Sequence, residues 1–523
     1  MIELRQVSFA HEGESAVLAE VSLELAESEL VLLTGPTGSG KSTLLGAIAG
    51  LVPRFSGGTL AGDELLDGQS ILHLPPRERA GHIGYVAQDP SAGFVTDSVE
   101  EELAYGMEQL GVPGATMRRR VEETLDLLGI AELRGRALRT LSGGQQQRVA
   151  IGSVLTMHPR FLVLDEPTSA LDPTAAEEVL ATLTRLVHDL GTGVLIAEHR
   201  LERVIPFADR MMLLPGDGTL RTGTPAEVLA YSPVAPPIVE LARLAGWDPL
   251  PLTVRDARVV ARRDHLTAVS APSHPSPVER DVALSGRGLT ASHGAVRALS
   301  SVDVDLQVGT VTALMGRNGS GKSTLLWALQ GSGTRSSGRV RTRAGDTADL
   351  SPADRRAVVA MLPQTAADLL YLETVAEECA VAGPGSAQIL ATLLPGIDPQ
   401  RHPRDLSEGQ RLAVALSLVL VSDPDVVLLD EPTRGLDYAA KAHLAGVLTD
   451  LAAQGKAVLV ATHDVEFAAI TADRVMVLAD GEVVSHGPSH EVLAESPAFA
   501  PQVTKILGPG WTRVEEVRTA LQR

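Results

Sequence analysis

Two stretches of this chain have residue types that bind phosphate, and they are nearly identical to each other. Residues 35–43 read Gly-Pro-Thr-Gly-Ser-Gly-Lys-Ser-Thr, and residues 316–324 read Gly-Arg-Asn-Gly-Ser-Gly-Lys-Ser-Thr. Glycines let such a loop curl until several backbone N–H groups point into one concavity, and the helix expected next adds the positive end of its dipole. The pattern predicts that Lys41 and Lys322 contact the β- and γ-phosphates of a nucleotide. The phosphate-binding residues that we expect are Gly35, Pro36, Thr37, Gly38, Ser39, Gly40, Lys41, Ser42, Thr43, Gly316, Arg317, Asn318, Gly319, Ser320, Gly321, Lys322, Ser323 and Thr324.

Each loop has a carboxylate that could complete a magnesium shell. The apolar runs at residues 161–165 and 426–430 are typical of buried strands, and they end in Asp165 and Asp430. In phosphate-loop enzymes, a carboxylate at such a strand end lies beside Mg²⁺, which the Ser or Thr hydroxyl of the loop also contacts. A glutamine downstream of each loop can sense the γ-phosphate or the metal. The metal-site residues that we expect are Ser42, Gln88, Asp165, Ser323, Gln364 and Asp430.

The residues that we expect to catalyse hydrolysis directly follow predicted strands. Glu166 and Glu431 come directly after the aspartates, where a carboxylate can polarise an attacking water as a general base. His199 and His463 follow short apolar runs and can contact the γ-phosphate and orient that water. A lone Asp-Glu-Pro turn or a lone histidine after a strand is usually structural. The same ordered set, present twice, favours hydrolysis of a nucleotide.

The two halves are predicted to be copies of a whole domain rather than short solenoid repeats. Corresponding positions lie 281 residues apart at the loops, 265 at the aspartates and 264 at the histidines. The second copy is therefore 16 residues shorter between its loop and its aspartate. Proline-rich stretches flank a helical-looking segment between the copies, which predicts a spacer that contains a folded piece. The expected boundaries are a first domain at 1–231, its C-terminal extension and linker at 232–282, a second domain at 283–495 and a final extension at 496–523.

Composition supports two large globular domains and excludes some partners. The chain has 523 residues, of which 44% are hydrophobic and only 3% aromatic, so its cores must rely on Leu, Val and Ala. A net charge of −20 makes it a poor candidate for binding nucleic acid or anionic lipid through its overall field. Cys379 is the single cysteine, which rules out an internal disulfide and favours a reducing compartment. No signal-peptide pattern is present, and the apolar runs fall short of the roughly 18 residues of a membrane span, so we expect a soluble chain.

The ordered set of motifs resembles the ABC-type ATPases. The set is a phosphate loop, a later glutamine, a Leu-Ser-Gly-Gly-Gln signature (Leu-Ser-Glu-Gly-Gln in the second half), an Asp-Glu-Pro strand end and a histidine. The resemblance implies an α/β fold with two tandem ABC-type P-loop ATPase domains, each with a RecA-like core sheet, an antiparallel β subdomain and an inserted helical subdomain. It also implies ATP and Mg²⁺ as cofactors, and signatures that bind the nucleotide held by the opposite half. The signature residues expected to bind nucleotide are Ser142, Gly143, Gly144, Gln145, Ser407, Gly409 and Gln410.

The two signatures differ at one position. The second has Glu408 where the first has Gly143. A carboxylate about 4 Å from a phosphate oxygen would cost several kcal/mol at an effective dielectric constant near 20, whereas a glutamate that points outward would merely suit a helix N-terminus. Both general bases are present, so we expect both sites to bind ATP. Under crossed pairing, we expect faster hydrolysis at the site that combines Lys322 with Ser142.

Further segments resemble one subgroup, the energy-coupling factor (ECF) ATPases, which drive uptake of vitamins and transition metals. These segments are residues 96–111 after the first glutamine, Glu-His-Arg-Leu-Glu at 198–202 and the extension at 235–256, which helps ATPase domains associate in that group. The second half keeps only Glu-Thr-Val-Ala-Glu-Glu at 373–378 of the first of these segments. The resemblance implies coupling helices of a transmembrane partner in the groove near Gln88 and Gln364.

The ECF resemblance implies integral membrane partners and a peripheral location on the cytoplasmic face of the cell membrane. The partners would be a transmembrane coupling protein and a substrate-binding membrane subunit, and the transported solute is left open. Alternatives are a tandem ATPase of a sugar or other ABC importer or exporter, and a soluble F-type ABC protein that acts on ribosomes. The strongly acidic chain and the proline-rich linker disfavour the ribosomal alternative. His11 and His293 stand where the family often has an aromatic ring against adenine, and we leave open whether they stack there.

Overall fold

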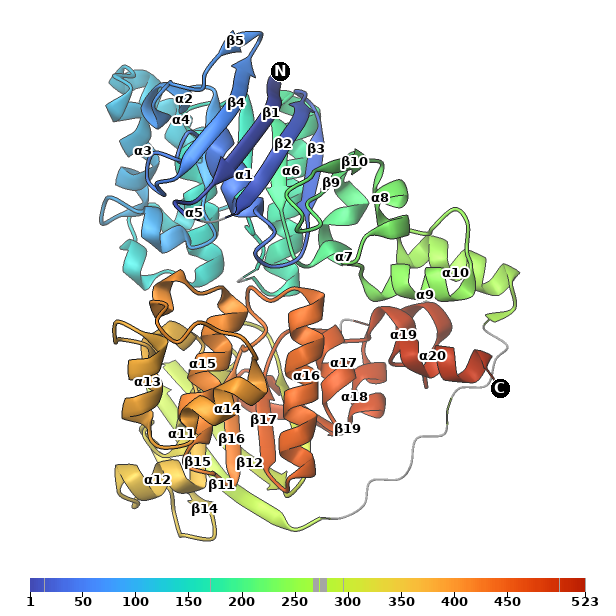
Figure 1. The fold of residues 1–523 in the computed structure, drawn as a ribbon. Helices are drawn as coiled ribbons and strands as arrows, with labels where there is room; N and C mark the ends of the chain where they lie inside the picture. Colours follow the sequence, from blue (N-terminus) through green and yellow to red (C-terminus); the bar gives the residue numbers. More distant parts are fainter. Residues whose placement is uncertain are drawn as a thin grey trace. The chain divides into compact units, whose positions relative to one another are not determined.

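The structure is a computed structural model that describes residues 1–13, 15–169, 171–266, 272, 280–294, 296–497 and 499–522. The chain forms two compact units (Figure 1). Unit 1 comprises Met1–Val239 and Asp248–Thr253, and unit 2 comprises Glu240–Trp247 and Val254–Arg523. Most of the second proline-rich stretch of the expected linker, residues 271–277, lies outside the described residues.

Unit 1 contains a six-stranded, mostly parallel sheet and a four-stranded antiparallel sheet. The strands are β1 (Ile2–Ala10), β2 (Ala16–Leu25), β3 (Leu30–Thr34), β4 (Thr59–Leu66), β5 (Gln69–Ser70), β6 (Ile83–Val86), β7 (Phe161–Asp165), β8 (Gly193–Ala197), β9 (Arg210–Leu213) and β10 (Arg221–Gly223). The six-stranded sheet has the order β10-β9-β3-β8-β7-β6, in which β10 is antiparallel to β9. Its strands β3, β7 and β8 are buried at every residue, because helices and the second sheet cover both faces. The antiparallel sheet has the order β2-β1-β4-β5.

Helices complete unit 1 and its inserted helical subdomain. They are α1 (Lys41–Ile48), α2 (Pro76–Arg79), α3 (Val99–Gln109), α4 (Gly114–Leu127), α5 (Gly143–Leu155), α6 (Pro173–Leu190), α7 (Leu201–Val204), α8 (Pro225–Tyr231) and α9 (Pro237–Ala245), with short 3₁₀ turns at Pro90–Gly93, Ala131–Leu133, Leu138–Thr140 and Ile205–Phe207. Helix α9 begins in unit 1 and ends in unit 2. Helices α3 and α4 contact each other and α5, and these three helices form the subdomain.

Unit 2 repeats this arrangement. Its strands are β11 (Val282–His293), β12 (Val296–Gln307), β13 (Val311–Met315), β14 (Ser337–Arg341), β15 (Val359–Leu362), β16 (Val426–Asp430), β17 (Ala457–Ala461), β18 (Arg474–Ala479) and β19 (Glu482–Pro488). The order β15-β16-β17-β13-β18-β19 matches that of unit 1, again with one antiparallel edge strand, and β12-β11-β14 forms the antiparallel sheet. The α/β architecture predicted from the motifs is confirmed in both units.

The helices of unit 2 include helices from the extensions that follow the first and the second half. They are α10 (Val254–Arg263), α11 (Lys322–Gln330), α12 (Pro352–Val358), α13 (Val375–Ala382), α14 (Ser386–Leu393), α15 (Glu408–Leu420), α16 (Tyr438–Ala453), α17 (Val465–Thr471), α18 (Ser489–Glu495), α19 (Gln502–Leu507) and α20 (Val514–Leu521), with 3₁₀ turns at Ala366–Leu369 and Pro403–Asp405. Helix α10, which follows the first half in sequence, contacts α19, which follows the second. The Arg258 guanidinium on α10 donates to the carbonyl of Lys505 on α19.

The shortening of the second half lies mainly in its helical subdomain. The glutamine lies 53 residues after the first loop begins and 48 after the second, whereas the signature serine follows the glutamine by 54 and 43 residues. Helices α3 and α4 have 11 and 14 residues, but α13 and α14 have 8 each. From signature serine to aspartate both halves have 23 residues. The deletion therefore leaves the segment that connects the signature to the aspartate unchanged.

The helix after each phosphate loop is buried between the two sheets of its unit. In unit 1, Leu44, Leu45 and Ile48 of α1 share one core with residues of the antiparallel sheet, such as Phe9, and of the parallel sheet, such as Val163. Leu325, Leu326 and Leu329 of α11 are buried in the same way in unit 2. This packing fixes the start of the helix against the sheet. None of the helices in the described part of the chain has the length and apolar character that would let it cross a bilayer.

Candidate functional site

The first phosphate loop joins the end of β3 to the start of α1. Gly40 caps the helix with a φ of 97°, and a Cβ there would lie 2.8 Å from Cγ1 of Val17, so glycine is required. Lys41 begins the helix, and its Nζ donates to the carbonyls of Gly35 and Pro36 at 3.0 Å each. The loop therefore closes around the lysine ammonium.

The second phosphate loop has the same geometry between β13 and α11. Gly321 caps α11 with a φ of 104°, and a Cβ there would lie 2.3 Å from the carbonyl oxygen of Ala298. Lys322 Nζ donates to the carbonyls of Gly316 at 2.9 Å and Arg317 at 3.2 Å. Both loops present a buried lysine at a helix N-terminus, the arrangement that attracts phosphate.

The strand-end aspartates lie beside the loop serines. Ser42 hydrogen-bonds to Asp165, which is 4% exposed, and Ser323 hydrogen-bonds to Asp430, which is 2% exposed. Burial raises the pKa of the Asp165 carboxyl to about 6 and raises the pKa of Asp430 as well. Oδ1 of Asp430 has no hydrogen-bond partner among the described residues. A buried carboxylate with a hydroxyl next to it provides the hard oxygen ligands that Mg²⁺ prefers.

The remaining ligands of such a magnesium ion would be phosphate oxygens and water. No group of three or more His, Cys, Asp or Glu side chains suited to a metal occurs in the part of the chain that the structure describes. Mg²⁺ usually binds through one or two carboxylates plus substrate phosphates, so a single aspartate per loop fits. The hydroxyls of Ser39 and Ser320 are buried in the loops without partners among the described residues, and they fit phosphate acceptors.

We predict that Mg²⁺-dependent nucleotide binding weakens as the pH falls below about 6. Because burial raises the pKa of Asp165 to about 6, this carboxyl is protonated below that pH, and Mg²⁺ must displace the proton. Affinity for Mg·ATP should fall about tenfold per pH unit below pH 6 at this site. Binding titrations between pH 5 and 8 would measure this. The double variant Asp165→Asn, Asp430→Asn corrects for protonation of ATP itself, and an identical pH profile in that variant would contradict the prediction.

Glu166 is held by two side chains of unit 1. His199 Nε2 lies 2.9 Å from its Oε1, and Gln88 Nε2 donates to its Oε2 at 3.1 Å. The structure thus brings together three of the residues predicted from the motifs, which come from the ends of β6, β7 and β8. Glu166 has a φ of 48°, a left-handed conformation that is costly for a non-glycine residue and is found mostly at functional sites. The backbone turns there, directly after β7.

Glu431 has a similar but not identical setting in unit 2. His463 Nδ1 lies 2.8 Å from its Oε2, and Lys322 Nζ lies 3.6 Å from its Oε1. Its φ is 49°, so both halves keep the same backbone turn. Gln364, the counterpart of Gln88, is exposed. The Glu431 carboxylate therefore lies next to the ammonium group of the phosphate-loop lysine.

Both signatures form capped helix starts. Ser142 accepts from the Gln145 backbone N–H at 3.4 Å, and the Gln145 side chain accepts from the Ser142 N–H at 3.0 Å. Ser407 and Gln410 make the same capping box at 3.3 and 2.9 Å. The box uses the third N–H of the helix, so the amides at the first two positions are left for an anion. In α5 these positions are Gly143 and Gly144, and in α15 they are Glu408 and Gly409.

Glu408 has an ionic partner on its own helix, which the sequence patterns did not indicate. Its carboxylate pairs with the guanidinium of Arg411, one turn further along α15. The side chains are 41% and 24% exposed, so the pair lies at the surface. The position of Arg411 is occupied by Gln146 in the first half. The extra charge in the second signature is thus compensated locally, which reduces the cost that we derived for an unpaired carboxylate.

Comparison with known proteins identifies the family. The ABC transporter family pattern matches residues 18–169 and 299–434. A protein of Streptomyces coelicolor, provisionally named an ABC transporter ATP-binding protein, is 54% identical over the full length of both chains. A Methanosarcina mazei protein with the same provisional name is 32% identical, with 94% of this chain and 90% of that protein covered. The chain belongs to the ABC transporter family. Its two ABC domains make it an ATPase.

Solved structures agree with this fold. The archaeal ribosome recycling factor aABCE1, solved with the ribosomal stalk protein aP1, matches with a TM-score of 0.57 over 90% of this chain and 89% of that one. The sequence identity is 22%, so this likeness concerns the fold alone. Two ABC cassettes in one chain thus occur in that protein as well as in the provisionally named relatives.

The histidine segments of this ABC ATPase contain interactions that the motifs did not indicate. In unit 1 the Glu198 carboxyl accepts from the backbone N–H of Thr168 at 2.7 Å. In unit 2 the buried Lys441 pairs with Asp464 at 2.7 Å. The residues on either side of the histidine differ between the halves, Glu-His-Arg in the first and Thr-His-Asp in the second. This difference is the sequence feature that could have indicated these contacts.

The histidines before the loops lie in different surroundings. His11 packs edge-on against Phe9, with ring centroids 4.9 Å apart. His293 Nε2 lies 3.2 Å from the Thr324 hydroxyl of the second phosphate loop. His293 is thus next to the phosphate loop, and whether either histidine stacks on adenine is left open.

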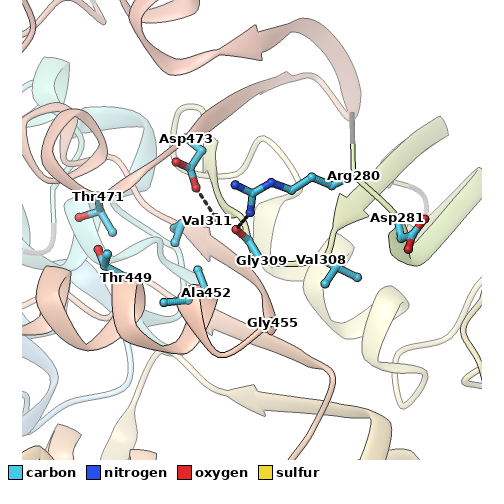
Figure 2. Close-up of a pocket in the computed structure, with 11 residues that line it drawn as sticks. Arg280, Asp281, Val308, Gly309, Val311, Thr449, Ala452, Gly455, Thr471 and Asp473 are labelled. Carbon is cyan, nitrogen blue, oxygen red and sulfur yellow. Dashed lines mark hydrogen bonds between the residues drawn. The ribbon is translucent and has the colours of Figure 1, made fainter. Parts of the chain in front are cut away.

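A surface pocket in unit 2 lies away from these residues. It has a volume of about 750 Å³ and includes Arg280, Gly309, Val311 and Asp473 in its lining (Figure 2). Val311 is the first residue of β13, whereas the phosphate loop follows the last residue of that strand. The pocket therefore lies at the opposite edge of the parallel sheet and is not part of the nucleotide site.

Proposed function

We propose that this ABC ATPase powers a membrane importer of the ECF type, which takes up a vitamin, a vitamin precursor or a transition metal. The provisional names of the relatives support a transport ATPase. The ECF subgroup is supported by the segments at residues 96–111, 198–202 and 235–256 that resemble it. The partners would be a transmembrane coupling protein and a substrate-binding membrane subunit, with this chain peripheral on the cytoplasmic face.

The pairing of the two extensions is the observation that carries the ECF proposal. Helix α10 from the first extension contacts α19 from the second, and the Arg258 guanidinium donates to the Lys505 carbonyl. Ala257 and Ala261 of α10 are buried, whereas Arg255 and Arg262 are exposed. A helix with one buried small-residue face is built to pack against a neighbour. The segment at residues 235–256, which resembles ECF extensions that help ATPase domains associate, runs into the first turn of this helix.

The mechanism that we propose assigns roles to residues of both halves. ATP with Mg²⁺ supplies the γ-phosphoryl group and the charge neutralisation for its transfer. Lys41 and Lys322 would hold the phosphates, and Asp165 and Asp430 would hold Mg²⁺ together with Ser42 and Ser323. Glu166 and Glu431 accept the proton of the attacking water.

The neighbouring side chains keep each base in place. His199 and His463 each contact the carboxylate of the base in their own unit, and this fixes the direction in which it points. Gln88 donates to Glu166 from the loop after β6, so a partner that moves this loop would alter the base. The proposed groove for a transmembrane partner lies next to this glutamine. ATP hydrolysis would in this way depend on partner binding.

The second candidate is a soluble ABC protein that acts on ribosomes. Its support is the fold likeness to aABCE1, which at 22% identity concerns architecture alone. The net charge of −20 disfavours contact with RNA phosphates. The ECF-type transporter is therefore the better-supported function.

Affinity purification of the tagged chain from detergent-solubilised membranes tests the proposal. We expect two integral membrane proteins to copurify and to stimulate ATP hydrolysis when they are reconstituted with the chain. The Arg258→Ala variant, which loses one contact between α10 and α19, should reduce recovery of the complex less than removal of the whole extension. Recovery with ribosomes and without an integral membrane protein would contradict the transport function. Recovery with a single pair of sugar-type permease subunits would contradict the ECF assignment.

A further inference from the structure

The loop after Glu166 is fastened to the segment that carries His199. The Thr168 N–H donates to Oε1 of Glu198 at 2.7 Å. The next residue, Ser169, donates through its hydroxyl to the carbonyl of Glu166 at 3.0 Å. A contact that holds Thr168 therefore also limits where the Glu166 backbone can lie. We infer that Glu198 is a positioning residue for the first catalytic site, an inference that rests on the proposed role of Glu166 as general base.

Glu198 is buried in a way that simple packing does not explain. Its side chain is 1% exposed, and both the backbone N–H and the side-chain hydroxyl of Thr168 hydrogen-bond to its carboxyl. Burial raises the pKa of the Glu198 carboxyl, and the nearby Glu166 charge adds to the effect. Burying a carboxyl is costly, and an apolar residue would avoid that cost. The contact to Thr168 is what a carboxyl provides here and an apolar residue could not.

Arg203, in the short helix α7 that follows His199, contacts the same loop. Its Nη1 donates to the carbonyls of Thr168 and Leu171, at 3.3 Å each. Glu198 thus binds the N–H of Thr168, and Arg203 binds its C=O. Both polar groups of one peptide residue are fixed by side chains of the histidine segment. This double attachment restricts rotation of the loop more than either bond alone.

The Glu198 segment also reaches the strand before the phosphate loop. Its backbone N–H donates to the carbonyl of Leu33 in β3 at 3.4 Å, and the neighbouring His199 Nε2 lies 2.9 Å from Glu166. Two consecutive residues are therefore bonded to β3, to Glu166 and to the loop after Glu166. This arrangement sets the distance between the phosphate loop and the base, on which in-line attack depends.

In the second half, different contacts hold the histidine segment. Thr462 replaces Glu198, and its hydroxyl accepts from the Asp464 N–H at 3.0 Å. Asp464 pairs with Lys441 of α16, where the first half has Arg200 and Ala176. The histidine segment of unit 2 is therefore attached to a helix. The role of Glu198 is specific to the first site.

The test uses the Glu431→Gln chain, so that the remaining turnover reports the Glu166 site. We expect Glu198→Ala to lower single-turnover ATP hydrolysis about tenfold with unchanged KM for ATP and unchanged Tm, because a displacement of about 1 Å in a catalytic group can cost up to about 100-fold. Glu198→Gln should restore most of the rate, since its amide oxygen can accept from Thr168. Glu177→Ala, which removes an exposed carboxylate on α6, is the matched control.

Arg203→Gln should lower the rate in the same way, and its effect should not add to that of Glu198→Ala if both hold one loop. An unchanged rate in Glu198→Ala would overturn the inference. Equal losses in Glu198→Ala and Glu198→Gln with a lowered Tm would also overturn it, because packing alone would then explain the residue. Glu166→Gln in the same background tests the proposed base separately: turnover that survives this change contradicts the function of Glu166, whatever Glu198 does.

Discussion

Replacement of Glu431 by glutamine is expected to slow hydrolysis at its own site about 100-fold and to remove most of the total ATPase rate, whereas Glu166→Gln should remove only the smaller share contributed by the slower site. A general base contributes about 10²- to 10⁴-fold, and glutamine keeps the shape of the side chain without its proton affinity. The resemblance predicts that the Lys322 loop works with the first signature, in which Gly143 and Gly144 begin α5. An anion at two glycine amides meets no side chain. The Glu431 site should therefore be the faster of the two.

Steady-state ATP hydrolysis by the purified chain, with nucleotide binding measured in parallel, checks this prediction. Both variants should still bind ATP, because Lys41 and Lys322 are unchanged. The matched control is a glutamine at an exposed glutamate such as Glu177, which should leave the rate unaltered. Equal losses in the two variants would contradict the asymmetry.

The pairing of Glu408 with Arg411 limits how large this asymmetry can be. A lone carboxylate about 4 Å from a phosphate oxygen would cost several kcal/mol. With a guanidinium one turn away on α15, the local charge is balanced, and the exposed pair itself is worth about 1 kcal/mol or less. Arg411→Gln, which installs the residue of the first half, should therefore widen the difference between the two glutamate variants. No change on this substitution would mean that Glu408 points away from bound nucleotide.

The motifs predicted the backbone of the site better than its side-chain contacts. The phosphate loops, the buried strands that end in Asp165 and Asp430 and the helix that starts at each signature all lie where their patterns predict. These features depend on local rules: glycine for a left-handed turn, apolar runs for central strands and serine for a helix cap. Local rules are readable from a single chain.

The contacts that the sequence did not predict join residues far apart in the chain. Glu198 binds Thr168 across 30 residues, and Lys441 binds Asp464 across 23. Such pairs depend on which strand ends become neighbours and on the rotamers chosen there, and neither has a periodic signature. A comparison of the duplicated halves could have indicated these contacts, because Glu198 and Thr462 occupy corresponding positions and differ in charge. The position of the deletion in the helical subdomain could be located in the same way.

A second large effect is expected outside the catalytic residues, at Arg79. This side chain is 3% exposed, and its Nη1 donates to Oε2 of Glu64 at 2.7 Å and to the carbonyls of Ala47 and Ile48 at 2.9 and 3.0 Å. Those carbonyls end α1, the phosphate-loop helix. Its other nitrogens donate to the carbonyls of Ile71, Leu72 and Leu74. The guanidinium thus joins the end of α1 to the antiparallel sheet.

Arg79→Ala is expected to lower the free energy of unfolding of unit 1 by about 3–5 kcal/mol. Removing one member of a buried pair leaves the other charge without compensation, and this usually costs about that much. Burial already raises the pKa of the Glu64 carboxyl, so the variant should take up a proton there as it folds. The carbonyls of α1 would also lose their donor. Hydrogen exchange of the amides of α1 in increasing urea measures this change for unit 1 separately from unit 2.

Unit 2 provides the matched control, because Arg355 occupies the corresponding position. Arg355 is only half-buried and donates to the carbonyls of Thr347 and Leu350, and the counterpart of Glu64 is Val340. Arg355→Ala therefore leaves no buried carboxylate unpaired and should cost about 1 kcal/mol, as expected for ordinary hydrogen bonds. Similar losses for the two arginines would contradict this expectation, because Arg79 is paired with a buried carboxylate and donates to more carbonyls than Arg355 does. Glu64→Val in the Arg79→Ala chain should then recover most of the lost stability, since it replaces the stranded carboxylate with the residue that unit 2 already has.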